Sequence, residues 1–573
     1  MNLKNKLVFD IETGGLGFNN EFICASFWES SSQLDTKLLS KPLIIEDTID
    51  YLTHFIPTHT IIGHNIYTFD LPFLVYKERQ SGSDKLFEAI VKYPHHFIDT
   101  LILAQVNRPH LHRHSVAVWE ERIKGQYPLL EKVSKYELDF DSDISMDDYI
   151  IRCENDVKIQ ACIYHYMHEK GWDKHSTVKS VCDFLPTTIS LLTNGIPMYL
   201  DKVAGIKQKL LTAKGRHTAN ITRSLKRKVN TRSSLQIQQA LLDLGHKGLP
   251  IGEPSEKTGK RSPKINKDNK FLVTSMYPSL MEVYNIRDID KQLQFLEIKE
   301  GSKVSLFTSM IGNRTYPKLN LLGTRTFRAQ YNNPPLNTID KRVRSLIGVK
   351  GMVGFDLEAL EYLILSYTIK EVFGDSAMWD NHYAGVCPKQ WTLEAFGELF
   401  DNADLTNTTR EGKAKTLNYA LLYGQGMKAT LAFLGLKSDK SNDVKQALEK
   451  RFPSFSNLTR LLKQNMVDKC VVNLWGQKVP SEDWLVLNTY AQSSGAGYAM
   501  RMFSCLTEVL HPYYTPIIFN HDEIQYVPVN EGKDRDFLNK SVEKAYTLFT
   551  ERYQMPIISK LNFDIGDNWS ETH

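Results

Sequence analysis

A polar tip between two apolar runs near the C-terminus is the feature that most constrains the fold of this chain. Residues 517–527 read Ile-Ile-Phe-Asn-His-Asp-Glu-Ile-Gln-Tyr-Val, and the β-branched and aromatic residues on both sides predict the two strands of a hairpin. The tip carries His521, Asp522 and Glu523. Acids beside buried strands are costly unless a cation neutralises them. Two interpretations follow: an ordinary solvated turn, or one half of a divalent metal site that needs a second carboxylate from elsewhere.

The bulk composition is that of a globular protein with several domains. The 573 residues are too many for one hydrophobic core, and 42% are hydrophobic and 24% charged. The seven cysteines form no CxxC pair, so neither a zinc ribbon nor a disulfide framework is predicted. Neither a targeting signal nor a membrane-spanning run is expected, which favours an intracellular protein with no membrane partner.

Four acids stand in similar settings within the first 160 residues. Asp10 and Glu12 lie two apart in an apolar run, so a strand would direct both to one face, where they repel each other unless a cation lies between them. Asp70 follows another apolar run and a polar loop that contains Asn65. Asp156 lies in a segment with helical spacing. Each acid alone suits a surface or capping position, but together they form a specific pattern.

This pattern resembles the DEDD family of 3′→5′ exonucleases, which proofread for many DNA polymerases. The resemblance implies an RNase H-like domain in which Asp10, Glu12, Asp70 and Asp156 hold two Mg²⁺ or Mn²⁺ ions, with Asn65 in the second motif. One position departs from the family. The water-orienting Tyr four residues before the third-motif Asp is Arg152 here, which predicts an exonuclease of reduced or altered activity. Tyr149 lies two turns from Asp156 on the same helical face.

The segment from Lys202 to Arg232 contains ten Lys or Arg and no acid. It suits contact with duplex phosphates, which gives affinity without sequence preference, and a solvated helix face is the alternative. Helical spacing continues to Leu244, with a helix start near Ser233 and a stop at Gly245.

The C-terminal half supplies the second carboxylate. Asp356 ends an apolar run, where it suits either a metal site or the N-cap of the next helix. Further on, Lys415, Tyr419 and Tyr423 are spaced four apart, so one helical face would carry a cation and two rings, which suits a nucleoside triphosphate. A core helix with a snorkelling lysine is the alternative.

Through these segments the chain resembles family A DNA polymerases, most closely the replicative enzymes of short-tailed bacteriophages. Residues 355–361 look like motif A, 415–424 like motif B and 521–523 like motif C. The resemblance implies that Asp356 and Asp522, with the backbone carbonyl of Leu357, hold two Mg²⁺ ions, and that Lys415 stabilises charge on the dNTP. It assigns substrate contacts to nine further residues: Arg328, Glu361, His382, Tyr419, Tyr423, Asn488, Gln492, His521 and Glu523.

Within these assignments, Glu361 and Tyr419 would exclude ribonucleotides, and a Tyr at position 419 predicts easy incorporation of dideoxynucleotides. Motif B departs from the family, because the slot four residues before Lys415 is Glu411 instead of Arg. Arg410 is a candidate replacement, and Glu411 also fits a capping box with Thr408.

The fold predicted is a multidomain α/β and α+β chain. An exonuclease domain (1–180) precedes a thumb (181–320), palm (321–370), fingers (371–460) and the remaining palm (461–573). The expected partners are primer–template DNA and dNTPs, with a replicative helicase and primase as further candidates, in the cytoplasm of a bacterial host. The thumb span looks too short for the insertion that binds thioredoxin.

Two alternative functions are open to a chain with these motifs. A single-subunit RNA polymerase would lack the exonuclease domain and Glu361. A stand-alone 3′→5′ exonuclease with a DNA-binding C-terminal half would not need Asp356, Lys415 and Asp522 together.

Overall fold

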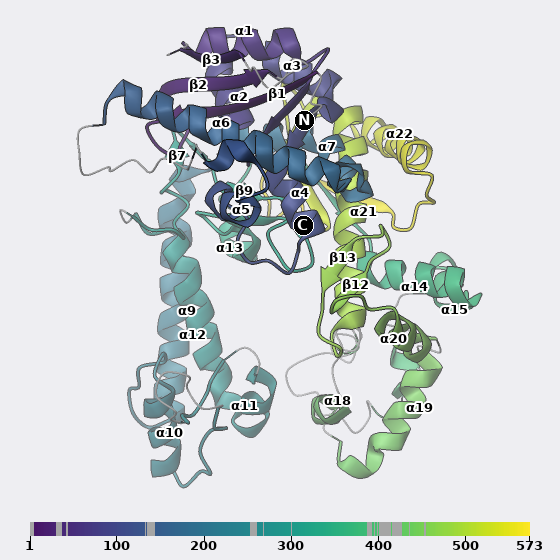
Figure 1. Cartoon of the computed structure of the whole chain (residues 1–573). Helices are drawn as coiled ribbons and strands as arrows, with labels where there is room; N and C mark the ends of the chain where they lie inside the picture. Colours follow the sequence, from purple (N-terminus) through teal and green to yellow (C-terminus); the bar gives the residue numbers. More distant parts are fainter. Residues whose placement is uncertain are drawn as a thin grey trace.

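The computed structural model describes most of the chain. The described residues are 5–29, 37–41, 44–131, 133, 144–252, 261–266, 269–298, 301–386, 392–394, 396–397, 399, 414, 417, 427–434, 436–451 and 454–573. Figure 1 shows an upper body from which two limbs extend downward, one built on α9 and α12 and the other ending in α18 and α19. None of the described helices is both long and apolar enough to cross a membrane.

The N-terminal domain is a mixed five-stranded sheet of order β3-β2-β1-β4-β5, covered by helices. β2 pairs antiparallel with β1 and β3, and β4 pairs parallel with β1 and β5. The strands are β1 (Lys6–Thr13), β2 (Phe22–Glu29), β3 (Lys37–Lys41), β4 (Thr60–Gly63) and β5 (Phe97–Asp99). The helices are α1 (Ile45–Phe55), α2 (Asp70–Gln80), α3 (Lys85–Lys92), α4 (Thr100–Asn107), α5 (Val116–Ile123), α6 (Met146–Glu169), α7 (Ser176–Asp183) and α8 (Leu185–Thr193).

The first limb is a helical stalk with its own small core at the tip. Its helices are α9 (Val203–Ser224), α10 (Ser234–Asp243), α11 (Lys270–Met276) and α12 (Met281–Phe295), and α9 packs along α12. The predicted start of α10 is confirmed, because the Ser233 hydroxyl caps it by accepting a hydrogen bond from the Gln236 N–H. Ile221, Ile237 and Val283 are among the residues of the tip core.

The second sheet has the order β14-β15-β11-β16, with every neighbouring pair antiparallel. Its strands are β11 (Met352–Leu357), β14 (Tyr514–Asn520), β15 (Glu523–Pro528) and β16 (Leu561–Gly566). The surrounding helices are α14 (Leu360–Phe373), α15 (Ala377–Tyr383), α21 (Val486–Leu510) and α22 (Arg535–Tyr553). Most side chains of α21 are buried, because other helices pack around it.

The remaining elements connect these bodies and form the second limb. The limb holds α18 (Met427–Leu434), α19 (Ser441–Arg451), α20 (Phe455–Gln464), β12 (Cys470–Val472) and β13 (Lys478–Pro480). The connecting elements are β6 (Ile196–Pro197), β7 (Met310–Ile311), β8 (Arg314–Thr315), β9 (Lys318–Asn320), β10 (Gln330–Asn332) and α13 (Lys341–Arg344). Short 3-10 helices lie at Pro94–His96, Pro128–Glu131, Trp172–Lys174, Leu200–Lys202, Pro278–Leu280, Leu336–Thr338 and Ser438–Lys440.

The N-terminal domain is docked firmly on the second sheet and its helices. One hydrophobic core runs through both, and α8 packs against β14. Asp183 at the end of α7 accepts hydrogen bonds from the Tyr553 hydroxyl at 2.8 Å and, through its backbone carbonyl, from Ser504 at 2.7 Å. His95 lies 2.9 Å from the same carboxylate. The two bodies are therefore held in a fixed relation by both apolar packing and polar contacts.

Candidate functional site

The first candidate site lies at the end of β1, where α2 and α6 meet the N-terminal sheet. Because alternate strand residues share a face, Asp10 and Glu12 both reach the acidic group predicted from the sequence. Carboxylate oxygens of Asp10, Glu12 and Asp156 lie within 4.8 Å of one another. Asp70 begins α2 and accepts a hydrogen bond from the Ile11 N–H at 3.3 Å. The cavity of about 440 Å³ beside them is lined by all four acids.

Burial and mutual repulsion make this acidic group costly without a cation. Burial raises the pKa of Asp70 to about 8, although backbone N–H groups stabilise its ionised form. The pKa of Asp10 is raised well above its ordinary value by burial and then by Asp70, Asp156 and Glu12. Oxygen ligands at this separation suit a hard divalent cation, which would remove the repulsion and keep the acids ionised. The donor set therefore fits the predicted Mg²⁺ or Mn²⁺.

Helix α6 brings three further side chains to this cavity. Its start is fixed by a capping box in which Ser145 and Asp148 exchange hydrogen bonds. Gln160, one turn after Asp156, donates a hydrogen bond to Asp10 at 2.9 Å. Tyr149 and Arg152 line the same cavity, and the Arg152 Nε lies 2.9 Å from a Glu12 oxygen. Arg152 is thus directed into the acidic group and contacts one of its members.

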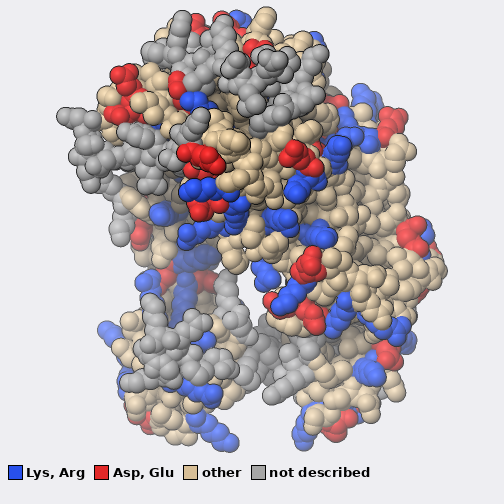
Figure 2. Space-filling model, viewed as in Figure 1, with Lys and Arg blue, Asp and Glu red and all other residues tan. Residues whose placement is uncertain are grey.

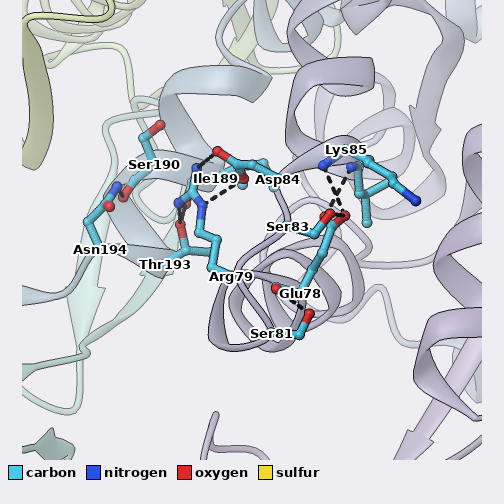
Figure 3. A network of polar contacts seen from close by, with 11 residues as sticks. Glu78, Arg79, Ser81, Ser83, Asp84, Lys85, Ile189, Ser190, Thr193 and Asn194 are labelled. Carbon is cyan, nitrogen blue, oxygen red and sulfur yellow. Dashed lines mark hydrogen bonds and ion pairs between the residues drawn. The ribbon is translucent and has the colours of Figure 1, made fainter.

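Helix α2, which carries Asp70, is anchored at its far end by the polar network of Figure 3. The Arg79 guanidinium donates to Asp84 at 2.8 Å and to the Thr193 hydroxyl of α8 at 2.7 Å. Glu78 accepts hydrogen bonds from the backbone N–H groups of Lys85 and Leu86, which begin α3. The network ties α2 to α3 and α8, so Asp70 sits on a rigid element.

Asn65 turns the chain between β4 and α2. Its φ of 68° lies in the left-handed region, which asparagine tolerates better than most residues. Asp99 holds this turn, because its carboxylate accepts from the backbone N–H groups of Asn65 at 2.8 Å and Tyr67 at 3.1 Å. The structure therefore places the Asn65 backbone in a turn that leads to Asp70, and its side chain accepts a hydrogen bond from Thr68.

The second candidate site lies on the second sheet, where the predicted hairpin is confirmed. β14 and β15 flank a turn at His521 and Asp522. The Cα of Asp356 pairs with that of Glu523 across β11 and β15, and the Leu357 N–H donates to the Asp522 carbonyl at 2.9 Å. Asp356 lies inside β11, so the N-cap alternative for it is wrong. Residues 166 positions apart are thus brought to one edge of the sheet.

Electrostatics at this edge resemble those of the first site. Burial and the neighbouring Asp522 and Glu523 raise the pKa of Asp356 to about 7. Burial raises the pKa of Asp522, and burial together with the positive charge of Arg328 lowers the pKa of His521 to about 4. Adjacent acids whose protonation is favoured by burial again suit a divalent cation.

Glu523 is held in place by a neighbour on its own strand and by the C-terminal end of the chain. It accepts a hydrogen bond from Gln525 at 2.6 Å and another from the Trp569 indole, and His573 lies 2.8 Å from its other oxygen. The C-terminal segment can lie this close because Gly354 has no side chain, since a Cβ there would stand 2.2 Å from the Thr572 carbonyl. Glu523 is therefore a buried, fixed acid beside the pair.

The other predicted contact residues lie around this edge. Arg328 forms a close ion pair with Glu361 at the start of α14. Gln492 on α21 accepts a hydrogen bond from Thr326 at 3.3 Å, and Asn488 lies one turn earlier with a buried Oδ1 that has no hydrogen-bond partner in the described part of the chain. His382 lies on α15, where burial lowers its pKa.

Four predicted residues, Arg410, Lys415, Tyr419 and Tyr423, lie outside the described residues, as do Thr408 and Glu411. Residues that the sequence did not single out include Gln160, Asp99 and Arg344. A local signal existed for Gln160, because it follows Asp156 by four residues on the same helical face. Arg344 reaches Glu523 only through the tertiary fold, and no local pattern marks it.

Basic side chains gather near the space between the two limbs. Figure 2 shows Lys and Arg above this opening and along the limb built on α9. Exposed basic residues on and just after α9 are Lys207, Lys209, Arg216, Arg223, Lys226 and Lys228. Others on this stalk are internally paired, such as Lys214, which lies 2.6 Å from Asp290.

Comparison with known proteins supports the fold. Neither a protein-family model nor a curated protein matches the sequence. Among solved structures, the chain is similar to the POL domain of Pol1 from M. smegmatis, solved in complex with a DNA primer-template and dNTP. The TM-score is 0.73 at 14% identity, and the alignment covers 99% of this chain and 96% of the other. The mixed α/β fold of the chain therefore matches that of this POL domain along almost its whole length.

Proposed function

We propose that the protein is a DNA-directed DNA polymerase that adds dNTPs to a primer 3′ end, with a 3′→5′ exonuclease site in its N-terminal domain. The observation that carries the polymerase proposal is the register of β11 and β15, which brings Asp356 beside Asp522 and Glu523 on a fold shared with a POL domain. Two neighbouring acids at a strand edge are the minimal protein contribution to a two-metal phosphoryl-transfer site. Mg²⁺ bound there would activate the primer oxygen and stabilise charge on the triphosphate.

The described residues have separate proposed roles in binding metal, DNA and the incoming nucleotide. Asp356, Asp522 and the Leu357 backbone would hold the ions, and Glu523 would keep the site acidic and dry. Exposed cations of α9 would bind duplex phosphates from one limb. Arg328, His521, Asn488 and Gln492 would line the primer and template near the strand edge, and Glu361, placed by its ion pair with Arg328, would crowd the sugar 2′ position.

On the resemblance alone, the proposed dNTP contacts are Lys415, Arg410, Tyr419, Tyr423 and His382. We take residues 321–370 and 461–573 as the palm, 181–320 as the thumb and 371–460 as the fingers. The motif resemblance further favours a replicative enzyme of a short-tailed bacteriophage, acting in the bacterial cytoplasm with a helicase and primase.

The exonuclease proposal rests on the four acids of the N-terminal domain and their cavity, within residues 1–180. A cavity of about 440 Å³ can accept a nucleotide, and Asp10, Glu12, Asp70 and Asp156 offer oxygen ligands beside it. Arg152 stands where the resembled family has its water-orienting tyrosine, so excision slower than in that family is expected.

A 5′-labelled primer–template with Mg²⁺, with and without dNTPs, separates the two activities. Asp522→Ala should abolish extension only, and Asp10→Ala should abolish primer shortening only. Two exposed acids supply matched controls: Asp564→Asn on β16 of the same sheet, and Asp147→Asn on α6. Shortening without extension by the wild type would favour the stand-alone exonuclease. The absence of both activities would refute both proposals.

A further inference from the structure

Arg152 forms an ion pair inside the acidic group of the N-terminal domain. Its Nε lies 2.9 Å from a Glu12 oxygen, and only 23% of the Arg152 side chain and 10% of the Glu12 side chain are exposed. Little water screens such a pair, so it is stronger than a pair on the open surface. Removing one partner of such a pair leaves the other charge poorly solvated.

The partner of Arg152 belongs to the group best placed to bind a metal. Glu12, Asp10 and Asp156 each offer an oxygen within 4.8 Å of the others. Arg152 precedes Asp156 by four residues on α6, so the helix itself directs both side chains to the same cavity. A divalent ion on this group would need the Glu12 carboxylate and would meet the positive guanidinium beside it.

Two roles are open to a cation in this place. An arginine that only bound substrate phosphate would face the open side of the cavity, with its guanidinium free to contact the phosphate. The Arg152 guanidinium instead forms an ion pair with a proposed ligand carboxylate, and its Nε lies 2.9 Å from a Glu12 oxygen. The contact therefore favours competition with the metal over recognition of the substrate.

We propose that Arg152 is a built-in competitor of the metal, and that a divalent ion loads the three-acid group only by displacing its ion pair with Glu12. The inference rests on the proposed exonuclease site and specifies how that site is regulated. The pair lowers the affinity of the group for a divalent ion roughly ten- to a hundredfold below that of the acids alone, as expected for a largely desolvated pair. Excision then depends on the divalent ion concentration.

Metal binding tests this directly and needs no catalysis. The full chain carrying Asp356→Asn and Asp522→Asn, which removes the palm acids, is titrated with Mn²⁺ while free Mn²⁺ is followed by electron paramagnetic resonance. Arg152→Gln in this background should bind Mn²⁺ roughly ten- to a hundredfold more tightly. Arg152→Lys keeps the charge and should bind weakly. Lys158→Gln is the matched control, because Lys158 lies on the same helix in a similarly exposed pair with Glu154.

Unchanged or weaker binding by Arg152→Gln would overturn the proposal. The tight binding gained in Arg152→Gln should also disappear when Asp156→Asn is added, and its persistence would place the ion elsewhere and overturn the proposal as well. If no version binds Mn²⁺, the N-terminal metal site itself is wrong and the competitor role falls with it. That result is distinguishable from failure of the polymerase proposal, which primer extension by the unmodified chain tests separately.

Discussion

Replacing Asp70 by asparagine should stabilise the metal-free protein at neutral pH, although Asp70 is a proposed ligand. Burial raises the pKa of this carboxyl from 3.8 to about 8. Folding at pH 7 therefore requires Asp70 to take up a proton that the unfolded chain does not hold. The contribution of Asp70 to the free energy of unfolding is fully present below pH 3.8 and is lost as the pH rises towards 8.

The magnitude follows from the pH interval. Each pH unit between 3.8 and the working pH costs about 1.4 kcal/mol, which gives about 4 kcal/mol at pH 7 and about 2 kcal/mol at pH 5. Asparagine avoids this cost and keeps an oxygen that can accept the Ile11 N–H. Because one hydrophobic core joins the N-terminal domain to the second sheet, the chain is expected to unfold as one unit. Its entropy of unfolding is then about 1.2 kcal/mol per degree, so Asp70→Asn should raise the melting temperature by about 3 °C at pH 7.

Thermal unfolding with a chelator at pH 5 and pH 7 is the assay, and Asp147→Asn, an exposed acid on α6, serves as the control. In millimolar Mn²⁺ the wild type should have a higher melting temperature than Asp70→Asn, because the wild type keeps a ligand that the variant lacks. A lower melting temperature for Asp70→Asn at pH 7 without metal, or an equal effect at both pH values, would refute the reasoning.

Three further predictions concern the second sheet and the stalk. Glu361→Ala should raise ribonucleotide incorporation roughly ten- to a hundredfold in primer extension, and unchanged selectivity would remove Glu361 from sugar recognition. Changing Lys207 and Arg223 to Gln should reduce the slope of log K against log salt for duplex DNA by about 2, measured by anisotropy, if each contacts one phosphate. His573→Ala should lower the melting temperature more at pH 6 than at pH 9, because the hydrogen bond to Glu523 raises the pKa of His573 and its stabilisation fades as the pH rises through that value. Equal losses at both pH values would argue against this contact.

The parts of the fold that sequence predicted are those set by short-range patterns. Alternation in residues 7–13 placed Asp10 and Glu12 on one face, and the apolar runs around Asp522 gave a hairpin that the structure contains. Helix α6 extends from Met146 to Glu169, as the spacing around Asp156 indicated. In each case the periodicity of the backbone determines which side chains share a face. A single sequence is therefore enough to predict these elements.

The contacts that sequence did not predict join distant elements. The sequence marks Arg152 as a departure from a motif, but its ion pair with Glu12 depends on how α6 packs against β1. His573 and Trp569 reach Glu523 only because β16 places the last residues over Gly354. The ion pair of Arg328 with Glu361 likewise joins segments that no periodicity relates.

Addition of single nucleotides to a primer tests template-directed synthesis most directly. Four primer–templates that differ only in the first template base are each offered one dNTP at a time with Mg²⁺, and the extended primer is resolved on a gel. The account predicts that the chain adds the complementary nucleotide on each template, and that Asp522→Ala adds none. Addition without regard to the template base, or equal addition by Asp522→Ala, would contradict it.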